Sequence, residues 1–218
     1  MDNIRPVIFV VGLLLCTLGA GMALPALVDL HSGNQDWRVF FLAMLATFFF
    51  GGMMVLSTAA DRNDMTITRR QGFLMIVLTW VLLSLFGAVP LWFAGELSLT
   101  DAVFESVSGL TTTGATIMTN LQEKPPGILL WRAILQWLGG IGVVLMAMSI
   151  MPFLKIGGMQ LFESEMTESE KALPRAGRMA ASIGLIYVVL TTCCVVLYYL
   201  AGMTPFDAVA RAMTTIST

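Results

Sequence analysis

Charged side chains are scarce in this 218-residue chain, because Asp, Glu, Lys and Arg together make up only 12% of it. A soluble globular domain carries about twice that share. The sequence also lacks a basic patch of the kind that binds nucleic acid, and a glycine-rich phosphate loop with its lysine. It shows no nucleophile–base–orienter set and no constellation of metal ligands. These absences argue against an enzyme, a nucleic-acid-binding protein and a protein with a bound organic cofactor.

Cysteine and histidine are rare as well. Cys16, Cys193 and Cys194 all lie in apolar stretches, so we expect small packing residues rather than disulfide or metal partners. His31, the single histidine, is expected at a surface or interface.

Charge is absent from five long windows, which are 6–28, 39–60, 71–95, 133–154 and 179–206. Each has at least about 20 residues, enough for an α-helix to span the hydrocarbon core of a bilayer. The first window is longer than the apolar part of a usual signal peptide, and its end fits a cleavage site poorly. We therefore expect an all-α polytopic membrane protein that keeps its first helix.

The distribution of lysine and arginine predicts the orientation. With the N-terminus inside, eight of these residues fall on the inner side and four on the outer side. The positive-inside rule then favours a cytoplasmic N-terminus.

The ends of the third and fifth windows repeat a pattern. Residues 92–103 read WFAGELSLTDAV and residues 198–209 read YYLAGMTPFDAV. In each copy Ala-Gly is expected to end a helix, because glycine tolerates a left-handed cap. A hydroxyl residue with an aspartate three positions later then starts a new helix, as in a capping box. The two aspartates, Asp101 and Asp207, are 106 residues apart, so this is an internal repeat.

The helix predicted at about 99–110 is too short to cross a bilayer. The stretch SGLTTTGATIMT at 108–119 follows it and is rich in threonine. Non-helical backbone at membrane depth survives only when it is buried in protein or lines water. A re-entrant pore loop meets that condition, with residues 111–115 as its extended return.

Such a return segment could bind a cation that has lost its hydration water. Backbone carbonyls and threonine hydroxyls supply oxygen ligands, and Gly114 permits backbone angles that strain other residues. The C-terminal end of the short helix adds a negative potential. Close packing of membrane helices also uses Thr and Gly, but a second copy of the whole unit is hard to explain by packing.

These residues resemble a known family. The segments DAVFESVSGLTTTGAT, WRAILQWLGGIGVVLMAMSIMPFLKIGGMQLFESE and FDAVARAMTTIST are similar to the Trk/Ktr/HKT superfamily of potassium transporters, most of all its bacterial TrkH/TrkG branch. The resemblance implies four helix–pore loop–helix units around one pseudo-fourfold pore. It also implies a homodimer in the bacterial inner membrane, with a cytoplasmic nucleotide-binding regulatory ring beneath it.

Carried over to this chain, the resemblance gives four parts. Residues 1–62 hold two extra N-terminal helices and 69–154 form the first helix–pore loop–helix unit. Residues 155–178 form a cytoplasmic connector, and 179–218 form a second unit that is truncated in its pore loop. The implied potassium filter residues are Thr111, Thr112, Thr113, Gly114 and Ala115 in the first unit, with Ser217 and Thr218 in the second.

Four further features carry expectations. Glu105 and Arg211 occupy equivalent repeat positions and are expected either to pair in the outer vestibule or to reach water separately. Arg132 is expected to be an interfacial anchor. The glycines of QWLGGIGVV are expected to allow close helix packing, and the acidic cluster at 163–170 to be a solvated loop.

The sequence thus predicts a potassium uptake protein with a channel-like pore, in which K⁺ is the transported ion. Two alternatives stay open. One is an alternating-access cation symporter built on broken helices, which inverted rather than parallel repeats would favour. The other is a non-conducting membrane fragment.

Overall fold

The structure, a computed structural model, describes residues 4–58, 68–150 and 172–218. The regular elements in these three ranges are all helical. They are α1 (Arg5–Gly21), α2 (Ala23–His31), α3 (Trp37–Thr58), α4 (Arg69–Phe93), α5 (Leu99–Leu110), the short 3-10 helix η2 (Leu121–Glu123), α6 (Pro126–Ile150), α8 (Ala172–Leu200) and α9 (Pro205–Ser217). Within these three ranges, five helical stretches are long and apolar enough to cross a membrane. The prediction of an all-α polytopic protein is therefore confirmed.

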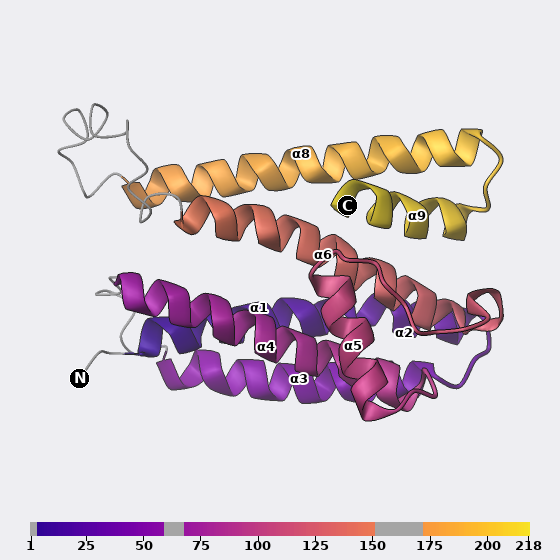
Figure 1. Cartoon of the computed structure of the whole chain (residues 1–218), viewed down its shortest axis with the longest axis horizontal. Coiled ribbons are helices and arrows are strands. Elements are labelled where there is room, and N and C mark those ends of the chain that lie inside the picture. The colour runs from indigo at the N-terminus through magenta and orange to yellow at the C-terminus, as the bar shows by residue number, and fades with distance from the viewer. Residues whose placement is uncertain (1–3, 59–67, 151–171) are drawn as a thin grey trace. The chain divides into compact units, whose positions relative to one another are not determined.

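The described chain divides into two compact units, one ending at Gly139 and the other beginning at Gly140. In the first unit α1 packs against α3 and α4, and α3 also contacts α4 (Figure 1). Close approach of α1 and α3 depends on two glycines. A Cβ on Gly12 would lie 2.8 Å from the carbonyl oxygen of Gly51, and one on Gly51 would lie 2.9 Å from that of Gly12. Small residues let membrane helices approach in this way.

The outer faces of α3 and α4 are apolar. Large side chains such as Leu42, Phe49 and Leu56 on α3, and Phe73 and Val77 on α4, are exposed. In water such faces would be costly, whereas hydrocarbon accepts them without a penalty. This distribution agrees with helices that face lipid.

The ends of α4 and α5 show how the sequence turns the chain. Thr68 and Gln71 form a reciprocal capping box at the start of α4. At the start of α5 the Ser98 hydroxyl accepts the amide of Asp101 at 3.2 Å, as predicted. The predicted bounds of α5, 99–110, agree with those observed.

One predicted cap was wrong. In the turn after α4 the left-handed residue is Glu96 (φ 56°) and not Gly95. Gly95 is needed there for another reason, since a Cβ on it would collide with the carbonyl of Leu91.

Helix α6 begins at Pro126, seven residues before the charge-free window. Arg132, which directly precedes that window, lies within the helix.

In the second unit α8 packs against α9, and Figure 1 shows the two helices side by side, joined by a tight turn. Gly202 supplies the left-handed residue in that turn, with φ 96°, as the repeat predicted. The hydroxyl of Thr204 accepts the amide of Asp207 at 3.2 Å and caps α9. The same cap therefore starts the short helix in both copies of the repeat.

Candidate ion site at the end of α5

The segment after α5 is tied back to that helix through its amides. The N–H groups of Thr111 and Thr112 donate to the carbonyls of Val107 and Gly109 at 2.8 and 2.9 Å. Those of Thr113 and Gly114 both donate to the carbonyl of Ser108, at 3.0 and 3.3 Å. No backbone amide of the described residues donates to the carbonyl oxygens of 111–114. Four successive residues thus have their amides bonded to the end of α5, while no described backbone amide occupies their carbonyl oxygens.

Two left-handed residues shape this segment. Gly114 has φ 70°, which agrees with the predicted need for glycine. Thr112 has φ 57°, which the sequence did not suggest because β-branched residues rarely adopt this conformation. The segment is therefore a tightly folded return and not the extended strand that was expected. Strained backbone of this kind is found most often at functional sites.

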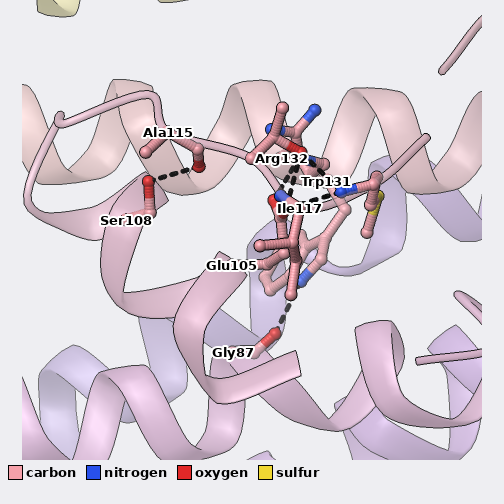
Figure 2. A network of polar contacts seen from close by, with 9 residues as sticks. Gly87, Glu105, Ser108, Ala115, Ile117, Trp131 and Arg132 are labelled. Carbon is pink, nitrogen blue, oxygen red and sulfur yellow. Dashed lines mark hydrogen bonds and ion pairs between the residues drawn. The ribbon is translucent and has the colours of Figure 1, made fainter. Parts of the chain in front are cut away.

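Ser108 holds both ends of the return segment. Its carbonyl accepts two amides from the segment, and its hydroxyl donates to the carbonyl of Ala115 at 2.6 Å. Figure 2 shows this hydroxyl, at the end of α5, facing Ala115. Ser108 is buried, whereas Ala115 is exposed. A single buried side chain thus fixes the far end of an exposed segment.

Glu105, one turn earlier on α5, anchors the chain beyond Ala115. One carboxylate oxygen, Oε1, accepts the Thr116 hydroxyl at 2.5 Å and the amides of Ile117 and Met118 at 2.7 and 3.3 Å. The other, Oε2, accepts Nε of Arg132 at 2.8 Å. The Glu105 side chain is fully buried. Because both oxygens are satisfied, the buried charge is stabilised.

Arg132 therefore has a partner that the sequence analysis did not assign to it. Its side chain is 19% exposed and pairs with Glu105, and its role as an interfacial anchor stays a prediction. The neighbouring Trp131 is fully buried and donates from Nε1 to the carbonyl of Gly87 at 2.9 Å. Figure 2 shows Trp131 and Arg132 extending from α6 towards α4 and Glu105, respectively. Consecutive residues of α6 thus bind α4 and α5.

Glycine again allows α6 to approach α5. A Cβ on Gly139 would collide with the carbonyl oxygen of Leu110, the last residue of α5. In the second unit a Cβ on Gly140 would lie 2.6 Å from the Tyr187 hydroxyl and 2.8 Å from Cβ of Ser217. Gly142 has nothing within 4 Å. The predicted role in packing is thus observed for the first two glycines and not for the third.

In the second unit the predicted filter residues lie at the end of α9. Ser217 is the last helical residue of α9 and Thr218 is the C-cap. The hydroxyls of both donate to the carbonyl of Thr214 at 2.9 Å. Arg211 is exposed on the same helix.

Pairing of Glu105 with Arg211 would join the two units and stays a prediction. Both carboxylate oxygens of Glu105 already accept hydrogen bonds within the first unit. The acidic cluster at 163–170 and most of the predicted connector at 155–178 lie outside the described residues. The sequence reasoning missed Ser108 and Trp131. A signal for the Glu105–Arg132 pair did exist, because two charges that are expected at membrane depth call for partners.

Comparison with known proteins also indicates a membrane transport protein. A family model described as TrkH, cation transport protein, matches residues 37–218. The Trk system potassium uptake protein TrkI of Halomonas elongata is 40% identical over the whole chain, and TrkH of Vibrio parahaemolyticus is 40% identical over 98% of it. TrkG of Escherichia coli is 36% identical over 99%. The chain spans 45%, 44% and 45% of these relatives, which is less than half their length.

A solved structure is similar over the same region. The crystal structure of the potassium transporter TrkH from Vibrio parahaemolyticus superposes with a TM-score of 0.84 at 39% identity, covering 98% of this chain and 42% of that one. The relatives carry the names of transporters and not of enzymes. Because the family model matches residues 37–218, which is most of this chain, the chain belongs to the TrkH family of cation transport proteins.

Proposed function

We propose that this chain contributes one part of a potassium uptake pathway across the bacterial inner membrane. The return segment, residues 111–115, forms one wall of an ion filter, with K⁺ as the transported ion. Ser217 and Thr218 begin the equivalent wall of the second unit. The names of the relatives, which are potassium uptake proteins, support the choice of ion.

One observation carries the proposal. The four amides of residues 111–114 are bonded to the end of α5, while their carbonyl oxygens accept no described backbone amide. A cation that sheds its hydration water needs such oxygens. The exposure of Thr111, Thr113, Gly114 and Ala115 leaves this face of the segment accessible.

The buried contacts behind the segment explain how it keeps its shape. Ser108 and Glu105 fix its far end and the chain just beyond it, and Arg132 holds Glu105 in place. Such contacts would hold the oxygen ligands of a filter in position. From the distribution of lysine and arginine we propose a cytoplasmic N-terminus. From the resemblance to the potassium transporter family we propose a homodimer and a cytoplasmic nucleotide-binding ring as partner.

The test uses a chimera, because the chain spans less than half of its relatives. The chain replaces the matching N-terminal part of TrkH from Vibrio parahaemolyticus, and the chimera is expressed in a bacterium that lacks potassium uptake. We expect growth at limiting potassium, and we expect Gly114→Ser to abolish it. Gly33→Ser is the matched control, because Gly33 has a similar φ of 73° and no neighbour within 4 Å.

The outcomes separate the candidate functions. Equal growth with Gly114→Ser and Gly33→Ser would contradict a filter at the return segment. The unfused chain is tested beside the chimera, and its failure to support growth would identify it as non-conducting alone. Uptake that saturates as in a carrier, with no single-channel currents from the reconstituted chimera, would favour the alternating-access symporter.

A further inference from the structure

We propose that Asp29 is a positioning residue for the ion site: its carboxylate, carried by the N-terminal helices, fixes the start of α6 and so the position of Arg132 and of the chain held by Glu105. Its importance for transport rests on the function proposed above. The structural part of the proposal can be tested without any transport measurement.

Asp29 lies in the last turn of α2 and is fully buried. Its Oδ1 accepts the amide of Gly127, the second residue of α6, at 2.8 Å. The two residues are 98 positions apart in the chain. Within the described residues, Oδ2 has no hydrogen-bond partner. A buried carboxylate in a candidate membrane span is costly, so its position calls for a compensating interaction.

The start of α6 supplies that interaction. Pro126 has no amide, and the amides of Ile128 and Leu129 both reach the carbonyl of Pro125, at 3.1 and 3.3 Å. In the first turn of α6, the amide of Gly127 therefore donates to Asp29. The positive end of the helix dipole favours a negative charge at this place. The carboxylate thus caps α6 from a distant segment.

Glycine at 127 is required by the same contact. A Cβ there would lie 2.5 Å from Cγ of Asp29 and 2.7 Å from Oδ1, and it would collide with Oδ2. Both carboxylate oxygens and the carbon between them thus occupy the space of the missing side chain. A side chain at position 127 would therefore displace the Asp29 carboxylate from this contact.

The start of α6 determines the position of the groups that follow. Trp131 and Arg132 come four and five residues after Gly127, so about one helical turn separates them from Asp29's contact. Trp131 also packs edge-on against Phe40 of α3, with ring centroids 6.3 Å apart. The N-terminal helices therefore contact α6 at two points about one turn apart, through Asp29 at Gly127 and through Phe40 at Trp131. A shift at Gly127 would be carried by the rigid helix to the Arg132–Glu105 pair.

The test measures how often the chain beyond the return segment opens. Met118 is 5% exposed and its amide is bound by Glu105, so a Met118→Cys reporter reacts with a water-soluble maleimide only when this chain opens. Ala43→Cys, at a buried position of α3, reports global opening. Both reporters are placed in the purified chain after the three native cysteines have been replaced by alanine.

We expect Asp29→Ala and Gly127→Ala each to raise the labelling rate at position 118 by about tenfold, the effect of leaving one buried amide without its partner. The rate at position 43 should not change. Gly142→Ala is the control, because it adds a methyl group to the same helix in open space, and it should raise neither rate. In the double variant Gly127→Ala should add nothing to Asp29→Ala, because the carboxylate it displaces is absent.

Three results would overturn the proposal. One is an unchanged rate at position 118 in both single variants. Another is an equal rise at positions 43 and 118, which would mean general unfolding. The third is independent, multiplying effects of the two substitutions in the double variant. None of these depends on potassium uptake, so the positioning role and the proposed function can fail separately.

Discussion

Glu105 and Arg132 are 27 residues apart in the chain, and Oε2 of the first lies 2.8 Å from Nε of the second. One charge comes from the short helix before the return segment and the other from the spanning helix after it. The pair therefore closes a loop around the segment 111–118. The contribution of this ion pair to the free energy of unfolding can be measured directly.

Substitution Glu105→Gln should destabilise the chain by about 3 kcal/mol, because it leaves the guanidinium of Arg132 largely buried without its counter-charge. The measurement is the free energy of unfolding of the purified chain in mixed detergent micelles. Glu96→Gln is the control, because Glu96 is 87% exposed and its ion pair with Lys124 is 3.8 Å long. This exposed pair should contribute less than about 1 kcal/mol. Equal losses of unfolding free energy in the two variants would show that the buried Glu105 pair stabilises the chain no more than the exposed one.

Ser108→Ala should cost about 1 kcal/mol of stability through loss of the hydrogen bond to Ala115. In the chimera it should also weaken discrimination between potassium and sodium, because the far end of the return segment is released. Ser98→Ala is the matched comparison, since loss of this N-cap costs a similar amount at the other end of α5. Potassium and rubidium uptake in competition with sodium would separate the two variants. Unchanged selectivity in Ser108→Ala would show that the hydrogen bond from Ser108 to Ala115 does not hold the return segment in its selective shape.

Two glycines of α6 should respond to alanine with opposite signs. Gly139→Ala places a methyl group against the Leu110 carbonyl and should cost about 2 kcal/mol. Gly142→Ala meets nothing within 4 Å and should stabilise the helix by up to about 1 kcal/mol. Unfolding free energies of the two variants provide the measurement. The same sign in both would contradict the close contact between α6 and α5.

Trp131→Phe should lower stability by about 1 kcal/mol, because the buried indole N–H that donates to Gly87 is lost while most of the ring is kept. Trp92→Phe, at an exposed position of α4, should stay within about 0.5 kcal/mol of the parent. Thermal unfolding in detergent compares the two. If both variants lose the same amount, the hydrogen bond to Gly87 does not tie α6 to α4.

Much of the fold could be predicted from the sequence, because membrane helices are marked by long apolar runs and helix starts by hydroxyl caps. All five spanning helices and both capped short helices were expected. The start of α6 could not be found in this way. A charge inside a spanning helix breaks the apolar run, and only the position of its partner, Glu105, shows why Arg132 is tolerated.

The candidate site was predictable in its location but not in its supports. Threonine and glycine beside a helix too short to span a bilayer indicated the return segment. Ser108 gave no signal, because a serine within a helix has the same pattern whether or not it binds a residue seven positions ahead. The left-handed Thr112 ran against local preference and was fixed by its surroundings. Asp29 depends on a residue 98 positions away, which no local pattern reveals.

The return segment has a consequence for anions. Binding of chloride or phosphate by backbone needs free N–H groups, as in the anion-binding nests of many proteins. Here the amides of residues 111–114 are all bonded to α5. The Thr111 hydroxyl donates to Val107, which leaves Thr113 as the donor in the bond between their hydroxyls. An anion that approaches residues 111–114 would therefore find none of their four backbone amides free to bind it.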